Sequence, residues 1–238
     1  MERGHARPAL GLDEAVVGAH DHVSHKRALG NLGDHSVVER PRFCHYFLQG
    51  TDGGGGMLFI LTGDIRSGKT TWLEARVREL EAAGVPVRGV LAPGVWRGGE
   101  KVGIENALLP SRERVLLATP AGGGCSAGLG WDFDAAALAR VNAHLSRLAA
   151  KTGEKDARPG LLAIDEVGPL ELRRGGGLTA ALELLDAGPA PTWPHALVVV
   201  RSALAEEAAA RWRPAWGSVE VLRSDERGRR RLLEHIPG

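Results

Sequence analysis

The sequence predicts an α/β fold in which a mostly parallel sheet is flanked by helices, and two observations support this class. The first is a set of short apolar runs, exemplified by Met57–Thr62, Leu161–Ile164 and Ala196–Val200, which are typical of strands buried on both faces. The second is that segments with helical periodicity separate these runs, as in chains built from strand–helix–strand units. The 238 residues suffice for one such domain and its hydrophobic core.

Periodicity and glycine define the first elements. The strand Met57–Thr62 leads into a helix over Lys69–Ala83, whose apolar residues lie on one face. Gly84 is expected to end this helix, because glycine adopts the left-handed conformation that closes many helices. A second strand, Val87–Leu91, follows, and then a glycine-punctuated region that predicts a small hairpin or meander insertion. Its short strands are expected near Gly94–Trp96, Lys101–Asn106 and Val115–Ala118.

The second half of the chain continues the alternation after a glycine-rich loop over residues 121–130. A helix is predicted over Asp134–Lys151, with Asp132 or Asp134 capping its start. The remaining predicted strands are Leu161–Ile164, Ala196–Val200 and Val219–Leu222. The remaining predicted helices are Thr179–Leu185, Leu204–Arg211 and a basic helix from about Asp225 to His235. One domain is therefore expected over residues 57–238.

The loop between the first strand and the first helix has the pattern G-x-x-x-x-G-K-[ST], from Gly63 to Thr70. A strand before it and a helix after it are the context in which this pattern binds phosphate. Glycines let consecutive backbone N–H groups turn toward an anion, and the positive end of the helix dipole adds to the attraction. Lys69 can reach the β- and γ-phosphates, while the Thr70 hydroxyl can ligate Mg²⁺. The motif predicts a nucleoside triphosphate as ligand.

Two carboxylates, Asp165 and Glu166, directly follow the apolar run Leu161–Ile164. In phosphate-loop proteins an aspartate at this place holds the Mg²⁺ shell. A glutamate beside it can orient a water for attack on the γ-phosphate, which favours hydrolysis, and fits an additional-strand fold better than a small-molecule kinase. The structural alternative is a carboxylate pair that caps a helix or faces solvent.

Two arginines are further candidates. Arg201 follows the strand Ala196–Val200, and ligands bind at the carboxyl ends of strands in open α/β sheets. It could stabilise transition-state charge at the γ-phosphate, or it could simply be solvated at the strand end. Arg66 lies inside the phosphate loop, and the sequence leaves open whether it approaches phosphate or points to solvent.

The amino-acid composition limits the binding partners and the cellular compartment that we expect for this protein. The chain has 30 Lys and Arg residues against 29 Asp and Glu, so no overall charge favours nucleic acid or a membrane surface. Only two cysteines are present, which suits a reducing cytoplasm, and no apolar run reaches the ~20 residues of a membrane span. Residues 1–56 lack sustained periodicity, so we expect either a disordered extension or an over-extended start of the reading frame. The oligomeric state stays open.

The stretch Ile164–Leu172, which reads I-D-E-V-G-P-L-E-L, carries a family resemblance together with the phosphate loop. The chain resembles the thermophile-type nucleoside-triphosphatases, a family that also includes the cancer-related nucleoside triphosphatase of animals. The resemblance runs from about Met57 to His235. Supporting matches are Thr62-Gly63, Gly68–Thr71 and, more loosely, the tail Asp225–Arg230.

The resemblance implies a RecA-like P-loop fold and Mg²⁺-dependent hydrolysis of ATP, GTP and other nucleoside triphosphates to diphosphate and phosphate. By position, the residues implied to bind phosphate are Gly63, Asp64, Ile65, Arg66, Ser67, Gly68, Lys69, Thr70 and Thr71. Asp165 and Thr70 would serve Mg²⁺, and Glu166 would activate the water. The family's loop often has a further glycine where this chain has Arg66. The alternatives are a P-loop kinase for a nucleotide or another small molecule, and a nucleotide-gated binding module.

Overall fold

One mixed sheet runs through the part of the chain that the structure, a computed structural model, describes: residues 55–121, 130–152 and 158–236. Its nine strands are β1 (Met57–Thr62), β2 (Val87–Leu91), β3 (Gly94–Arg97), β4 (Glu100–Leu109), β5 (Glu113–Pro120), β6 (Trp131–Phe133), β7 (Leu161–Val167), β8 (His195–Val200) and β9 (Ser218–Arg223). The predicted extension, apart from its last two residues, and the interior of the predicted glycine-rich loop lie outside the described residues.

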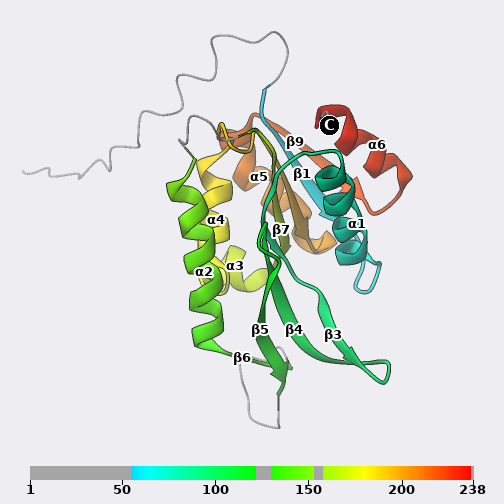
Figure 1. Ribbon diagram of the computed structural model, residues 1–238, viewed down its shortest axis with the longest axis vertical. Coiled ribbons are helices and arrows are strands. Elements are labelled where there is room, and N and C mark those ends of the chain that lie inside the picture. Colours follow the sequence, from blue (N-terminus) through cyan, green and yellow to red (C-terminus); the bar gives the residue numbers. More distant parts are fainter. Residues whose placement is uncertain (1–54, 122–129, 153–157, 237–238) are drawn as a thin grey trace, which may run out of the picture. The chain divides into compact units, whose positions relative to one another are not determined.

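Five neighbouring strands are parallel, in the order β2-β7-β8-β1-β9 (Figure 1). β8 lies between β1 and β7, although it follows both of them in the chain. Because all five strands point the same way, the carboxyl ends of β1, β7 and β8 meet at one edge of the sheet. Ligands bind at this edge in open α/β sheets.

Helices cover both faces of the sheet. They are α1 (Lys69–Ala82), α2 (Ala135–Ala150), α3 (Pro169–Arg174), α4 (Thr179–Ala187), α5 (Ala205–Trp216) and α6 (Glu226–His235), with a 3₁₀ turn, η2 (Ser202–Leu204), before α5. α1 and α6 pack on one face, and α2, α4 and α5 pack on the other (Figure 1). In β1, Phe59 and Leu61 belong to the core under α1, while Leu58 and Ile60 belong to the core under α5. Burial on both faces explains why this strand is an unbroken apolar run.

The glycine-punctuated region forms the three predicted strands, β3, β4 and β5, as an antiparallel meander. This meander joins the main sheet, because β4 pairs directly with β2 in antiparallel register, with Gly89 opposite Leu109. The described sheet is therefore mixed rather than mostly parallel, with β3 to β6 forming its antiparallel side. The sequence does not predict β6 or α3, since three and six residues are too few to show a period.

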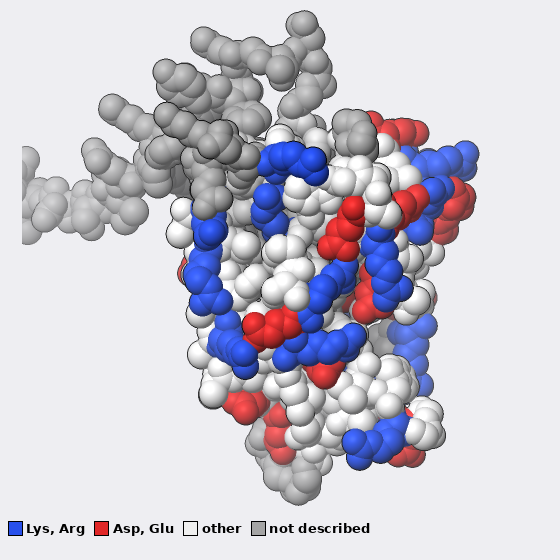
Figure 2. Space-filling view, viewed as in Figure 1, with Lys and Arg blue, Asp and Glu red and all other residues white. Residues whose placement is uncertain are grey.

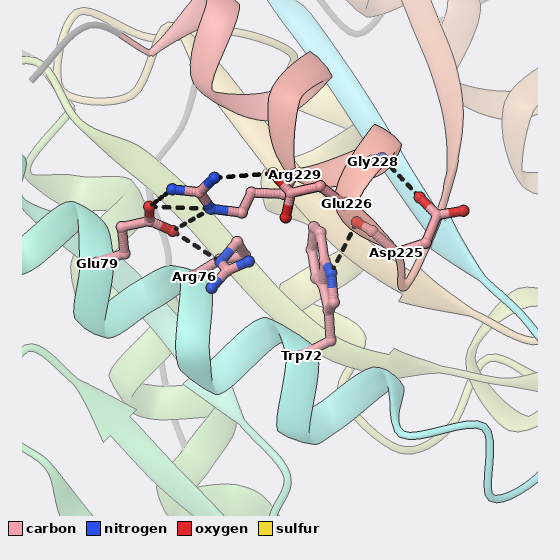
Figure 3. Close-up of polar contacts among 7 residues, drawn as sticks. All are labelled: Trp72, Arg76, Glu79, Asp225, Glu226, Gly228 and Arg229. Atoms are coloured by element: carbon pink, nitrogen blue, oxygen red, sulfur yellow. Dashed lines mark hydrogen bonds and ion pairs between the residues drawn. The ribbon is translucent and has the colours of Figure 1, made fainter.

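Hydrogen bonds and ion pairs hold helix α6 against α1 (Figure 3). Trp72 Nε1 donates to the backbone oxygen of Asp225 at 3.2 Å, and the Asp225 carboxylate caps α6 by accepting from Gly228 N at 2.8 Å. Further along, Arg229 Nε donates to both oxygens of Glu79, at 3.0 and 3.2 Å. The end of the chain is thus held beside the helix that opens at the phosphate loop.

We predict that Gly89→Ala strongly destabilises the fold. Gly89 has φ of +122°, and a Cβ there would lie 2.0 Å from the backbone oxygen of Ala163 in β7, so two central strands would have to separate. A loss of at least ~3 kcal/mol in the free energy of unfolding is expected by denaturant titration. Gly98→Ala is the matched control, because φ is +59° there but no atom lies within 4 Å of the added Cβ. It should cost only ~1 kcal/mol, and equal losses would contradict the close-approach explanation.

We also predict a pH-dependent contribution from Glu79. The hydrogen bond from Arg229 is the largest cause that lowers the pKa of Glu79 below its ordinary value of 4.5, with burial opposing it. A carboxylate with a lowered folded-state pKa stabilises the fold above its unfolded value, and this contribution is lost as pH falls through the folded value. Glu79→Gln should therefore lower Tm by a few degrees at neutral pH and by progressively less below pH 4.5.

The control for Glu79 lies on the same helix. Glu74 contacts Arg78 at 3.5 Å, and the Arg78 side chain is 70% exposed, so Glu74→Gln should change Tm little at any of these pH values. Equal Tm losses for the two variants, or a Glu79→Gln effect that does not shrink in acid, would refute the assignment.

Candidate active site

The phosphate loop lies between β1 and α1, at the carboxyl edge of the parallel strands. Gly68 is the N-cap of α1 with φ of +79°, a left-handed conformation that glycine adopts without strain. Ser67 N donates to Asp64 O at 3.2 Å and closes the turn, and Trp72 N donates to Gly68 O at 2.8 Å at the start of the helix. The first-turn N–H groups, which have no helical acceptors, and the positive end of the helix dipole are therefore available to an anion at this edge.

The Lys69 side chain folds back over this loop. Its Nζ donates to the backbone oxygens of Gly63 at 2.9 Å and Asp64 at 2.7 Å, and lies 3.5 Å from Ser67 Oγ. The loop thus curves around the ammonium group. An anion entering the loop can exchange these neutral contacts for charge-assisted ones, which are stronger.

Asp165, at the end of β7, is fully buried and has two partners. Its Oδ2 accepts from Ala92 N at 2.9 Å, and its Oδ1 accepts from the Thr70 hydroxyl at 3.3 Å. Burial raises the pKa of Asp165 to about 7, and the two hydrogen bonds offset this only in part. A buried carboxylate that is short of compensation, next to a hydroxyl oxygen, is a donor set that suits a hard divalent cation. The residues present therefore fit Mg²⁺.

Glu166 is the next residue but faces a different way. The pairing of β7 with β8 shifts register between Ile164 and Val167, and Glu166 has φ of +69°, a conformation that costs a non-glycine residue roughly 1 kcal/mol. This irregularity leaves Asp165 buried while the Glu166 side chain is 45% exposed. Backbone strain of this kind is often found at functional sites.

Arg201 meets Glu166 across the strand ends. It follows β8, the neighbour of β7, and its Nη2 donates to Glu166 Oε1 at 3.0 Å. Its position at the strand end is therefore as the sequence predicts, and its partner in the structure is the carboxylate predicted to activate water. The structure thus brings Lys69, Thr70, Asp165, Glu166 and Arg201 to one edge of the sheet, and Thr71 follows in the first turn of α1.

Arg66 occupies a left-handed position of the loop, with φ of +63°, and is exposed. Glycine takes this conformation without strain, which gives a backbone reason for the glycine that the family often has here. Ile65 beside it is 78% exposed. The tip of the phosphate loop therefore faces solvent.

In the stretch Ile164–Leu172, which carries the family resemblance, the residues after the two carboxylates hold the start of α3. Glu171 Oε2 accepts from the N-cap amide of α3, Gly168 N, at 2.9 Å, and Glu171 Oε1 accepts from Leu178 N at 3.2 Å. Pro169 stands at the first helical position, which suits its fixed φ. Glu171 thus holds the chain that follows β7 and the two preceding carboxylates.

The sequence analysis missed several contacts that shape the site. Ala92 N, which holds Asp165, follows β2 at the same edge. Ser224 Oγ donates to Ser67 O at 3.3 Å from beyond β9, and Ser202 Oγ lies 3.5 Å from Asp64 Oδ1. Only their place in the sequence could have indicated these residues, because each of them directly follows a strand or lies one residue beyond it.

The face of the molecule drawn in Figure 2 has no large patch of only positive or only negative side chains. Figure 2 shows acidic side chains interspersed among the basic ones, in keeping with the balanced composition. Among the helices of the described residues, none has the length and apolar character needed to cross a bilayer.

Comparison with known proteins supports the resemblance. The model of a protein family described as NTPase matches residues 58–236. Curated relatives named nucleoside-triphosphatase THEP1 come from Methanopyrus kandleri, 31% identical over 54% of this chain and 67% of its own length, and from Hyperthermus butylicus, 34% identical over 54% and 65%.

Two solved structures are also similar. A human cancer-related nucleoside triphosphatase aligns with a TM-score of 0.51 and 25% identity over 75% of this chain and 94% of its own. THEP1 from Aquifex aeolicus aligns with a TM-score of 0.52 and 16% identity over 75% and 95%, which supports the fold. Since the family match spans the phosphate loop, both strand-end carboxylates and α6, the chain belongs to the NTPase family of nucleoside triphosphatases.

Proposed function

We propose that this protein hydrolyses nucleoside 5′-triphosphates, ATP and GTP among them, to the diphosphate and phosphate in a Mg²⁺-dependent reaction. The observation that carries the proposal is the convergence of the phosphate loop with the Asp165–Glu166 pair at one sheet edge. The relatives named nucleoside-triphosphatase support the reaction class. A cytoplasmic location remains a prediction from the composition.

The phosphate loop would hold the triphosphate tail. Backbone N–H groups and the α1 dipole attract its oxygens, and Lys69 releases the carbonyls of Gly63 and Asp64 to pair with phosphate charge. Thr70 and Asp165 would hold Mg²⁺, which supplies charge neutralisation at the phosphate oxygens when bound.

Glu166 would orient the attacking water. Its carboxylate accepts a proton as the water oxygen bonds to the γ-phosphorus, and the bond from that phosphorus to the bridging oxygen breaks to leave the diphosphate. Arg201, held at 3.0 Å from Glu166, is close enough to turn toward the charge that develops on the γ-phosphate. β8 between β1 and β7 supports a RecA-like, additional-strand form of the fold, in which such a glutamate is expected.

A second candidate function is phosphoryl transfer to a small acceptor, and one observation favours it. A cavity of about 230 Å³ opens beside Glu166 and Arg201, and its walls include Trp131, Phe133 and Leu170. An acceptor could occupy this space next to the γ-phosphate. Analysis of products formed from triphosphate alone separates the two functions, because a kinase requires the acceptor and a hydrolase releases phosphate without it.

We predict that Glu166→Gln keeps triphosphate binding within a few-fold of the wild type and lowers the rate of phosphate release by about 10²–10³-fold, since the amide cannot accept the proton. Single-turnover phosphate release and equilibrium binding of a labelled triphosphate measure the two effects. Glu207→Gln is the control, because Glu207 pairs with the exposed Arg173 on the surface. Normal turnover by Glu166→Gln would exclude Glu166 as the base.

We predict a different pattern for Lys69→Ala. Removing the ammonium eliminates contacts made in both the bound and the transition states, so binding should weaken by about tenfold or more and turnover should fall as well. The same binding and single-turnover assays distinguish this from the Glu166 pattern, in which binding is kept. Unchanged binding by a folded Lys69→Ala protein would show that the loop does not hold the triphosphate in the proposed way.

A further inference from the structure

The cavity beside Glu166 and Arg201 has an apolar wall that the proposed hydrolysis does not use. This wall comes from β4, β5 and β6, from α2 and from the segment after β7 (Figure 1). None of the described residues that line the cavity belongs to the phosphate loop, so the loop lies outside it. The main apolar side chains are Ile104, Leu117, Trp131, Phe133, Leu138 and Leu170.

Much of this wall is open to a ligand. Trp131 and Phe133 on β6, Ile104 on β4 and Leu138 on α2 are each only partly buried. A ligand that covers them gains about 25 cal/mol for each Å² of apolar surface that it removes from water. The volume of about 230 Å³ is below the ~300 Å³ at which sites for drug-sized ligands begin. A molecule built on a single ring therefore has the right size.

Most charged groups of the lining already have partners. Asp165 and Glu171 each accept a hydrogen bond at both carboxylate oxygens. Glu166 is paired with Arg201 at 3.0 Å. These four groups therefore need no further ligand to compensate their charge in the structure as it stands.

Lys101, on β4, is the exception. No carboxylate or hydrogen-bond acceptor among the described residues pairs with its ammonium, which lies 5.4 Å from the centroid of the Trp131 ring. Trp96 stands beside Lys101, because a Cβ on Gly94 would lie 2.7 Å from Trp96 Nε1 and 3.1 Å from Lys101 Cε. Trp96 is 59% exposed and Lys101 is only partly buried. A ligand can therefore approach this cation from solvent.

We propose that this cavity binds a small aromatic anion, whose ring packs against Trp131 and Phe133 and whose anionic group pairs with Lys101. Aromatic walls favour a planar ring, which can stack on them in an offset or an edge-to-face arrangement. The anion is favoured because Lys101 is the charged lining group without a counter-charge, and a charge-assisted contact is stronger than a neutral one. The proposal is independent of the proposed function, since it holds whether the γ-phosphoryl group goes to water or to an acceptor.

The test uses the full-length protein without nucleotide. Benzoate and phenyl phosphate are the aromatic anions. Benzyl alcohol and benzylamine carry an uncharged and a cationic group on the same ring, and cyclohexanecarboxylate keeps the anion without an aromatic ring. Binding is followed through the indole N–H signal of Trp131 in NMR spectra, assigned by its loss in Trp131→Phe.

We expect this signal to shift with at least one aromatic anion, with a Kd at least about fivefold below that of each of the three controls. The tighter of the two anions then identifies the head group. No shift with either aromatic anion up to about 10 mM would overturn the proposal. Binding of any control as tight as that of the aromatic anions would overturn it as well.

Variants locate the bound anion. Lys101→Gln should weaken its binding by about tenfold, whereas Arg114→Gln on the neighbouring strand β5, where Arg114 pairs with Glu105, should not. Lys69→Ala should also leave this binding unchanged, because the phosphate loop lies outside the cavity. Equal affinity in wild type and Lys101→Gln would overturn the proposal. A loss confined to Lys69→Ala would also overturn it, since it would place the anion in the phosphate loop.

Discussion

The structure depends on one buried carboxylate. Asp165 ends the central strand β7, accepts a hydrogen bond from the residue after β2, and accepts another from the first turn of α1. It therefore joins three segments that lie far apart in the sequence. Burial makes the negative charge of Asp165 unfavourable unless a positive charge lies beside it. The raised pKa of Asp165 and the affinity expected for a cation therefore have the same physical origin. The demand for a counter-charge is built into the core of the fold.

Glu166, the next residue, shows how the sheet places two neighbouring carboxylates in different surroundings. A regular strand would alternate Asp165 and Glu166 between the two faces, both under helices. The irregularity at this point, with the left-handed Glu166, instead keeps one carboxylate inside and delivers the other to the edge beside Arg201. The Glu171 carboxylate, which accepts from Gly168 N, then fixes the chain immediately after this turn. Local strain is thereby held in place by contacts that involve no catalytic group.

The sequence predicts the parallel part of the fold well because four of its strands, β1, β2, β7 and β8, are buried on both faces and each motif is contiguous. The phosphate loop and the carboxylate pair are found for that reason. The antiparallel side is harder, since β4 alternates exposed and buried residues only in part and its pairing with β2 is a long-range choice. The contacts of Ala92, Ser202 and Ser224 cannot be predicted from the sequence, because they depend on which strand ends become neighbours.

The position of β8 has a consequence for how the molecule is made. During synthesis, the loop after β1 and the two carboxylates near the end of β7 leave the ribosome before the strand that separates them. Since β8 pairs with both β1 and β7, these two strands acquire their final spacing only when residues 195–200 have been inserted between them. A nascent chain that stops short of β8 carries the phosphate loop and both carboxylates, but it lacks Arg201 and the strand that sets the distance between the loop and the carboxylates. Competence for catalysis is therefore acquired late in translation, in one topological step.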